Sequence, residues 1–183
     1  MVGSKINGVF LDIGAYDGRT RSNSYALAQM GWSGVLVEPS APVFTELLNL
    51  HGKNSKLHLV QCLIGSKRGL VPFWPSRDGV STSNKDHYEK WKDDAEFEPV
   101  VYVPQITVPD LIEELPVILE STVVSIDVEG GSAELFLGWP FELCRPEVFC
   151  VEYDDRASEL ASFADQYGYG VTYKSNENLV LVR

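Results

Sequence analysis

The sequence predicts a doubly wound α/β fold with a mostly parallel sheet that ends in an antiparallel hairpin. Short continuous runs of Val, Ile, Leu and Phe alternate with helical patterns, which is typical of βαβ units whose strands are buried on both faces. The last two strand-like runs are joined by residues 175–178 alone, and a connection this short requires an antiparallel hairpin. The 183 residues, 44% of them hydrophobic, suit a single domain with one core.

The core elements follow one another in a regular order. We expect strands at residues 8–13, 34–37, 57–64, 122–126 and 148–151. Helical patterns occupy residues 23–30, 42–51, 133–136 and 156–167. The hairpin, at residues 170–174 and 179–182, completes a seven-stranded sheet. Because ligands of doubly wound folds bind beyond the carboxyl ends of the strands, the residues that close each strand are the candidate site residues.

Residues 66–109 interrupt this alternation. They combine prolines with aromatic residues and contain two strand-like pieces, at residues 70–74 and 100–103. The mixed-charge stretch 85–92 within them is interpreted as a solvated surface. We therefore expect an insertion that lies over one end of the sheet.

Charge and composition limit the classes of partner and compartment. The net charge of −11 disfavours nucleic acid, whose binding needs clustered Lys and Arg. Neither a secretion signal nor an apolar run of roughly 18 residues is visible, so we expect a cytoplasmic protein without a membrane partner. Cys62, Cys144 and Cys150 lack the spacing of zinc ligands and are expected to be unlinked thiols.

The first predicted strand ends in the sequence FLDIGAYDG, which forms a tight turn around Gly14 and Gly18. A pyrophosphate-binding turn usually has the spacing GxGxxG, so this turn favours a cofactor without phosphates. Asp12 is placed to hold an ammonium group of that cofactor. Ala15 and Tyr16 lie in the same turn and are assigned to cofactor binding with it.

The second predicted strand ends in VLVEP, at Glu38 and Pro39. A carboxylate in this place can accept two hydrogen bonds from a ribose diol. A single strand-end Glu is often a solvated surface charge. In combination with the Gly14 turn, Glu38 predicts a nucleoside-containing cofactor.

The strand at residues 122–126 leads into Asp127 and Glu129, and the next strand into Glu152. Residues two apart on an extended segment point to the same side, so Asp127 and Glu129 both face the crevice. We assign them as candidates for a general base, and Asp127 also to cofactor binding. One alternative is that these acids cap the following helices. Another is a divalent cation held by Asp127, Glu129 and Glu152, although no metal is assigned.

At these residues the sequence resembles the FkbM family of methyltransferases. The matching motifs are FLDIGAYDG, SNSY at residues 22–25, GWSGVLVEP at 31–39, SIDVEG at 125–130, Gly138, and VEYD at 151–154. The resemblance implies a class I methyltransferase fold, S-adenosylmethionine as cofactor, and methylation of an oxygen, often on a sugar or natural product. Two departures concern the acceptor side: Ser132 stands where the family commonly has Glu, and Asp154 where Asn is frequent.

We therefore expect a methyltransferase that acts on a small-molecule or glycan acceptor. Flat aromatic faces in the insertion can pack against such an acceptor, and the candidates are Trp74, His87, Tyr88 and Trp91, together with Glu152. The alternative for the aromatic residues is that they pack the insertion onto the sheet. Two other functions stay open: a non-catalytic cofactor-binding module of the same fold, and an oxidoreductase with a nucleotide cofactor.

Overall fold

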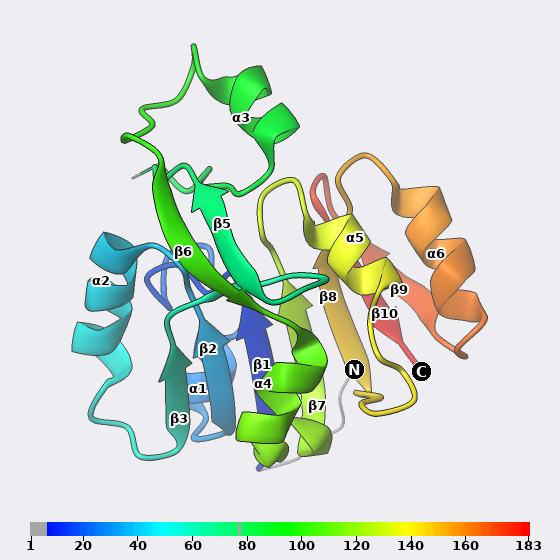
Figure 1. Cartoon of the computed structure of the whole chain (residues 1–183). Coiled ribbons are helices and arrows are strands. Elements are labelled where there is room, and N and C mark those ends of the chain that lie inside the picture. Colours follow the sequence, from blue (N-terminus) through cyan, green and yellow to red (C-terminus); the bar gives the residue numbers. More distant parts are fainter. Residues whose placement is uncertain (1–6, 77) are drawn as a thin grey trace.

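The computed structural model describes residues 7–76 and 78–183 and contains a seven-stranded sheet in the order β3-β2-β1-β7-β8-β10-β9 (Figure 1). Six of the seven strands run in the same direction, and β10 is antiparallel to both of its neighbours, β8 and β9. This confirms the predicted fold class, including the closing hairpin. The strands are β1 (Val9–Ile13), β2 (Ser33–Val37), β3 (Leu57–Val60), β7 (Ser121–Ile126), β8 (Val148–Glu152), β9 (Gly170–Lys174) and β10 (Asn178–Val182).

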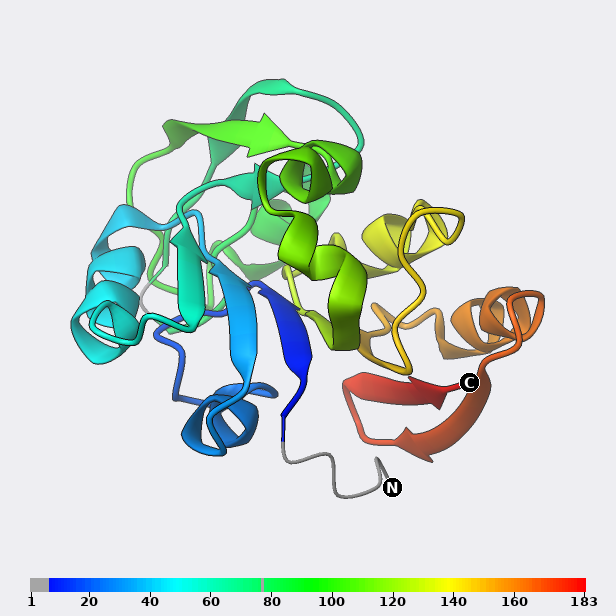
Figure 2. The same cartoon turned by 90° about the horizontal axis from the view of Figure 1, so that it is seen from below.

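Helices cover both faces of this sheet, as Figures 1 and 2 show. Because side chains alternate along a strand, Phe10 packs on one face with residues of α1 and α2, and Leu11 packs on the other face with residues of α4, α5 and α6. All five residues of β1 are buried, as expected for a central parallel strand. The helices are α1 (Tyr25–Gln29), α2 (Ala41–His51), α4 (Val108–Glu114), the 3-10 helix η1 (Pro116–Glu120), α5 (Ser132–Leu137) and α6 (Ala157–Asp165).

The predicted strand 57–64 is two strands. β3 ends at Val60, and β4 (Leu63–Ile64) belongs to a separate small sheet with the order β4-β6-β5. The Gly65 N–H continues this pairing by donating to the carbonyl oxygen of Ile106 at 2.9 Å. Pairing with β6 (Val101–Ile106), rather than with β2, therefore turns the chain away from the main sheet.

The rest of the insertion contains β5 (Gly69–Phe73) and a short helix, α3 (Lys85–Trp91). The solvated-surface interpretation of residues 85–92 missed this helix. Its N-cap is Asn84, whose side chain accepts hydrogen bonds from the backbone N–H groups of Asp86 and His87. α3 and the ends of β5 and β6 lie above the carboxyl edge of the main sheet in Figure 1.

Two smaller expectations concern membranes and thiols. Within the described residues, no helix combines the length and the apolar composition needed to cross a membrane. The three cysteines are free thiols; Cys62 and Cys144 are buried and Cys150 is partly buried.

Candidate functional site

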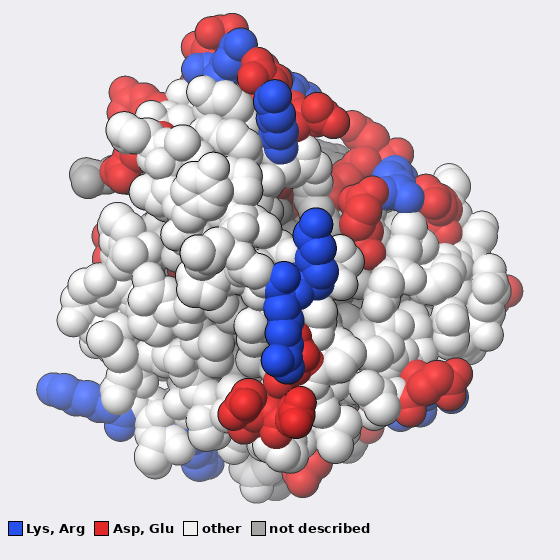
Figure 3. All heavy atoms as spheres, in the orientation of Figure 1, with Lys and Arg blue, Asp and Glu red and all other residues white. Residues whose placement is uncertain are grey.

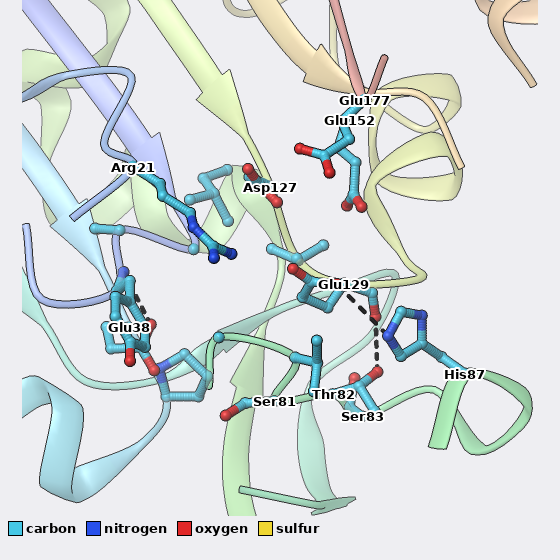
Figure 4. A pocket seen from close by; sticks show the side chains of 18 of the residues that line it. Arg21, Glu38, Ser81, Thr82, Ser83, His87, Asp127, Glu129, Glu152 and Glu177 are labelled. Carbon is cyan, nitrogen blue, oxygen red and sulfur yellow. Dashed lines mark hydrogen bonds and ion pairs between the residues drawn. The ribbon is translucent and has the colours of Figure 1, made fainter. Parts of the chain in front are cut away.

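A cavity of about 450 Å³ lies at the carboxyl ends of β1, β2, β7 and β8 (Figure 4). Its floor is formed by the loops that follow these strands. The insertion contributes residues 79–83 with His87, Lys90 and Trp91, and the β9–β10 turn contributes residues 176–178. The cavity is thus enclosed by segments from most of the chain.

The turn after β1 packs directly against the end of β7. Gly14 has φ +86°, and a Cβ built on it would lie 1.7 Å from the carbonyl oxygen of Asp127. The backbone N–H groups of Gly14 and Ala15 both donate to the carbonyl oxygen of Val37, at 3.0 Å. Only glycine allows this approach, which lets the backbone itself line the cavity floor.

Gly18 has a packing role at the far end of this turn and is not among the residues that line the cavity. It has φ +74°, and a Cβ there would meet the side chains of Leu47 and His51. The His51 Nε2 atom lies 3.1 Å from the Gly18 carbonyl oxygen. The turn is therefore closed on α2, and His51 is structural.

Glu38 closes β2 as a buried carboxyl group, only 6% exposed. One of its oxygens accepts a hydrogen bond from the Tyr16 N–H at 3.1 Å, and the other accepts one from the Ser40 N–H at 2.7 Å. Burial raises the pKa of Glu38 to about 7, against these two hydrogen bonds. Each oxygen keeps a lone pair for a further donor, as a ribose diol requires.

Asp12 lies at the base of the cavity, 3% exposed. It accepts a hydrogen bond from the Ser24 hydroxyl at 2.5 Å. Burial raises the pKa of Asp12, while hydrogen bonds from Ser24 and Ser125 oppose that rise. Ser125 also accepts a hydrogen bond from the Asn23 side chain, so Asp12 belongs to a polar cluster that joins the SNSY segment to β7.

The wall across the cavity from Glu38, formed by the ends of β7 and β8, is acidic. One carboxylate oxygen from each of Asp127, Glu129 and Glu152 lies within 4.8 Å of the others. Burial, followed by repulsion from neighbouring carboxylates, raises the pKa of all three, that of Glu129 to about 8. For Asp127 the repelling groups are Asp12, Glu177 and Asp154, and a hydrogen bond with Glu152 lowers its pKa. Glu152 is oriented by the Ser132 hydroxyl, which donates to it at 2.9 Å and accepts from the Val128 N–H. Ser132 is thus a buried link between the two acidic strand ends.

The insertion is hydrogen-bonded to the loop after β7. The Thr82 hydroxyl donates to the Glu129 carbonyl oxygen at 2.7 Å, and the Asn84 side chain donates to the Gly130 carbonyl oxygen. His87 Nε2 lies 3.5 Å from a carboxylate oxygen of Glu129, as Figure 4 shows. The insertion therefore shapes the site as well as covering it.

The predicted aromatic residues of the insertion divide into two groups. Trp91 and His87 line the cavity. Trp74 and Tyr88 are not lining residues; they stack on each other with ring centroids 4.8 Å apart, and Phe97 packs edge-on against Tyr88. Trp74 and Tyr88 therefore pack within the insertion, on each other and on Phe97. Pro39 lines the cavity next to Glu38.

Several lining residues were not found by sequence reasoning. Arg21 has φ +54° and extends between Glu38 and the acidic wall in Figure 4. Glu177 comes from the β9–β10 turn, and the Tyr153 N–H donates to its carbonyl oxygen at 2.9 Å. One signal was available for Glu177: a hairpin antiparallel to β8 must place its turn at the carboxyl end of β8.

The fold and site together define a class I S-adenosylmethionine-dependent methyltransferase. The sheet order, with one antiparallel strand inserted next to the edge, is combined with a Gly14 turn and an acidic β2 end that fit a nucleoside cofactor without phosphates. The chain belongs to the methyltransferase FkbM domain family, whose model matches residues 12–171. S-adenosylmethionine is accordingly the cofactor.

Solved structures with the same fold are distant in sequence. Precorrin-6y C5,15-methyltransferase from Geobacter metallireducens is 13% identical with a TM-score of 0.51, over 96% of this chain and 79% of that one. Streptococcus pneumoniae Sp1610, a putative tRNA (m1A22) methyltransferase, is 12% identical with a TM-score of 0.53, over 96% and 64%. Aeropyrum pernix fibrillarin, solved with natively bound S-adenosyl-L-methionine, is 8% identical with a TM-score of 0.52, over 99% and 69%.

This chain therefore spans less than two thirds of the length of Sp1610. A comparison with curated proteins gave no match.

Proposed function

We propose that this protein methylates a hydroxyl oxygen of an uncharged acceptor, such as a sugar, a glycan or a natural product. The observation that carries the proposal is the pair Asp127 and Glu129, which both line the cavity at the end of β7. S-adenosylmethionine supplies an electrophilic methyl group. The protein then has to align the acceptor and take its hydroxyl proton, for which a partly buried carboxylate is suited.

The charge of the cavity supports an uncharged acceptor. Its basic lining residues are Arg21 and Lys90, with His87 as a third titratable group. Its acidic lining residues are Asp12, Glu38, Asp127, Glu129, Glu152, Asp154, Asp155 and Glu177. An acceptor rich in phosphate or carboxylate groups would be repelled. On the face in Figure 3, acidic side chains lie over α5 and α6, acidic and basic side chains are mixed over α3, and the surface over β5 and β6 is largely uncharged.

Glu129 is our preferred general base. Its side chain is 27% exposed, so it is open to the cavity, whereas Asp127 is closer to Asp12 and the Gly14 turn. Because burial raises the pKa of Glu129 to about 8, this carboxylate is a stronger base than an ordinary one once it has lost its own proton, and turnover should therefore increase as the pH rises through this range. Asp127 is proposed to hold the cofactor's ammonium end together with Asp12.

Two measurements test the proposal. Calorimetry should detect binding of S-adenosylmethionine and S-adenosylhomocysteine, and not of NAD. A panel of sugars, glycans, hydroxylated metabolites and an RNA hairpin should then be assayed for S-adenosylhomocysteine release, with and without EDTA. NAD binding without S-adenosylmethionine binding, or turnover on the RNA alone, would contradict the proposal. Cofactor binding without turnover on any acceptor would favour the non-catalytic module.

The assay with EDTA distinguishes two roles for Asp127, Glu129 and Glu152: proton transfer, or binding of a divalent cation. Oxygen ligands at this spacing also suit a hard divalent cation such as Mg²⁺. Turnover that survives thorough chelation assigns proton transfer to the carboxylates alone. Turnover that is lost with EDTA and restored by Mg²⁺ assigns Asp127, Glu129 and Glu152 to the cation.

A further inference from the structure

We propose that Arg21 binds the α-carboxylate of S-adenosylmethionine and makes the site selective for a cofactor whose amino-acid end carries that group. S-adenosylmethionine is the cofactor of the family. The proposal also rests on the places proposed above for the ribose, at Glu38, and for the ammonium group, at Asp12 and Asp127. Arg21 lies between the FLDIGAYDG and SNSY motifs and belongs to neither of them.

The first observation is the charge balance of the cavity. S-adenosylmethionine carries two positive groups, its sulfonium and its ammonium, and one negative group, its carboxylate. Among the described lining residues, acidic side chains outnumber basic ones. The positive groups therefore have several partners, whereas the carboxylate is repelled unless a cation lies next to it. Arg21 and Lys90 are the two described lining residues that carry a positive charge at neutral pH.

The second observation separates these two cations by their places in the fold. Arg21 belongs to the loop after β1, and its side chain extends between Glu38 and the acidic wall (Figure 4). Lys90 belongs to α3 in the insertion, where its Nζ atom lies 5.4 Å from the ring centroid of Trp91. Arg21 therefore lies between the residues proposed for the ribose and the ammonium, and Lys90 lies beside a candidate for acceptor binding.

The third observation is that the Arg21 guanidinium is open to a ligand. Arg21 is exposed, and its side chain makes neither a hydrogen bond nor an ion pair with the part of the chain that the structure describes. Burial and nearby carboxylates raise the pKa of Glu129, and Arg21 lowers it, so the guanidinium is near the acidic wall without direct contact. Arginine has five N–H donors in a planar fork that matches both oxygens of a carboxylate. All of these donors are available at Arg21.

The fourth observation is that the backbone on both sides of Arg21 is fixed. Before it, the Asp17 carboxylate accepts a hydrogen bond from the Thr20 N–H at 2.6 Å. After it, the Ser22 hydroxyl accepts one from the Tyr25 N–H at 3.0 Å, at the start of α1. Arg21 itself has φ +54°, in the left-handed region that arginine rarely adopts. The two turns maintain this strained conformation, which directs the guanidinium into the cavity.

The proposed contact gives the site a preference between two closely related ligands. Decarboxylated S-adenosylmethionine differs from the cofactor by the loss of the carboxylate alone. This analogue cannot pair with Arg21, and its cationic end is repelled by the guanidinium. The parent protein should therefore discriminate against it, and the discrimination should depend on Arg21.

Calorimetry of the full chain with these two ligands, without any acceptor, tests the contact. Arg21→Gln should weaken S-adenosylmethionine binding about 10- to 100-fold and change binding of the decarboxylated analogue less than about 3-fold, because only the first ligand loses a charged hydrogen-bonded pair. Arg21→Lys keeps the charge without the planar fork and should recover part of the loss. Arg19→Gln is the matched control, since Arg19 is exposed in the same loop and is not a lining residue.

The other possible roles of Arg21 give different results, and each of them would overturn the proposal. Equal losses for the two ligands in Arg21→Gln would mean that the guanidinium only offsets the general charge of the cavity. Unchanged affinity for S-adenosylmethionine would remove Arg21 from the cofactor site, and a raised acceptor KM would then assign it to the acceptor. A carboxylate-specific loss in Lys90→Gln instead would assign the contact to the insertion.

A second variant separates the contact from a structural role of the side chain. Arg21→Gly suits the left-handed backbone, so the melting temperature without cofactor should not fall while the preference for the carboxylate is lost. A lower melting temperature together with weaker binding of both ligands would show that Arg21 holds the loop and would contradict the proposal. If no acceptor is methylated, the proposed function fails, but these binding results stand because the assay contains no acceptor.

Discussion

The two walls of the cavity are built in different ways. The wall formed by the ends of β1 and β2 is held by backbone hydrogen bonds to the carbonyl oxygen of Val37 and by the close packing of Gly14 on the carbonyl oxygen of Asp127. The opposite wall is assembled from side chains of four separate segments. Both walls contain left-handed non-glycine residues, Tyr16 in the first and Glu129, Asp154 and Asp155 in the second. The first wall is thus held by backbone contacts, and the second by side-chain contacts and charge. We therefore expect substitutions in the two walls to have different effects.

The largest expected effect is at Gly14. In Gly14→Ala the new Cβ clashes with the carbonyl oxygen of Asp127. Because this oxygen belongs to the backbone, it cannot move aside as a flexible side chain would. We expect a loss of more than about 4 kcal/mol in the free energy of unfolding, enough to leave little folded protein. Gly168→Ala is the control: its φ is +79°, but its Cβ would meet nothing within 4 Å. It should cost only about 1–2 kcal/mol. Equal costs by urea denaturation would refute the backbone clash.

The next effect separates chemistry from structure. Asp127→Asn and Glu129→Gln keep the shape of the wall and should leave the melting temperature within a few degrees of the parent. Loss of the base should lower kcat by about 10²–10⁴ at saturating cofactor. Glu134→Gln changes an exposed acid of α5 and should keep full activity. If Glu129→Gln retains normal kcat, Glu129 is not the base.

A third comparison concerns the aromatic residues of the insertion. Trp74→Ala removes the stack on Tyr88 and should destabilise the protein by about 2–3 kcal/mol, below the range for a fully buried Trp because Trp74 is partly exposed. Trp91→Ala should spare stability and instead raise the acceptor KM, since Trp91 lines the cavity. Equal melting temperatures for the two variants would refute this division.

On the β1–β2 wall, Glu38→Ala should weaken S-adenosylmethionine binding by about 1.5–3 kcal/mol, the range for hydrogen bonds to a charged group. Calorimetry measures this directly. Glu46→Ala, an exposed position on α2, should bind the cofactor normally. Unchanged affinity in Glu38→Ala would remove Glu38 from the cofactor site.

The last effect is the pH dependence of stability without cofactor. The pKa values of Glu38 and Glu129, about 7 and about 8, lie above the ordinary value of 4.5, so the folded state binds these protons more tightly than the unfolded state. This contribution is complete below about pH 4.5 and is lost as the pH rises through 7 to 8. The melting temperature should therefore be lower at pH 8.5 than at pH 5.5, by about 2–4 °C per kcal/mol lost. The double variant Glu38→Gln, Glu129→Gln should weaken this trend without abolishing it, because the pKa values of Asp127 and Glu152 are also raised, to about 6 and about 9. A rising trend in the parent would contradict the prediction.

The fold could be predicted from the sequence because its cues are local. Alternating apolar runs and helical patterns identify βαβ units, and the 175–178 connection allows only a hairpin. The placement of Asp12, Gly14 and Glu38 along one edge then follows from the order of the strands. The family model and the sheet confirm the family and the fold class.

What could not be predicted depends on contacts between distant residues. Thr82 meets Glu129, 47 positions away, and no local pattern encodes that contact. The helix α3 has no buried residue, so it lacks the apolar periodicity by which helices are recognised. The run at residues 57–64 is apolar on both sides of the break after Val60, and only the competing pairing with β6 divides it.

The hydrogen bonds from Thr82 and Asn84 to the loop after β7 also bear on how such enzymes can be re-engineered. Exchanging residues 66–109 for the corresponding segment of a relative would change the loop after β7 as well as the surface that binds the acceptor. The donor segment would have to bring a hydroxyl and an amide at the positions of Thr82 and Asn84, or the Glu129–Gly130 turn would relax. The same segment therefore determines both acceptor specificity and the rate of turnover. A chimera that binds a new acceptor but lacks these two side chains should turn that acceptor over slowly.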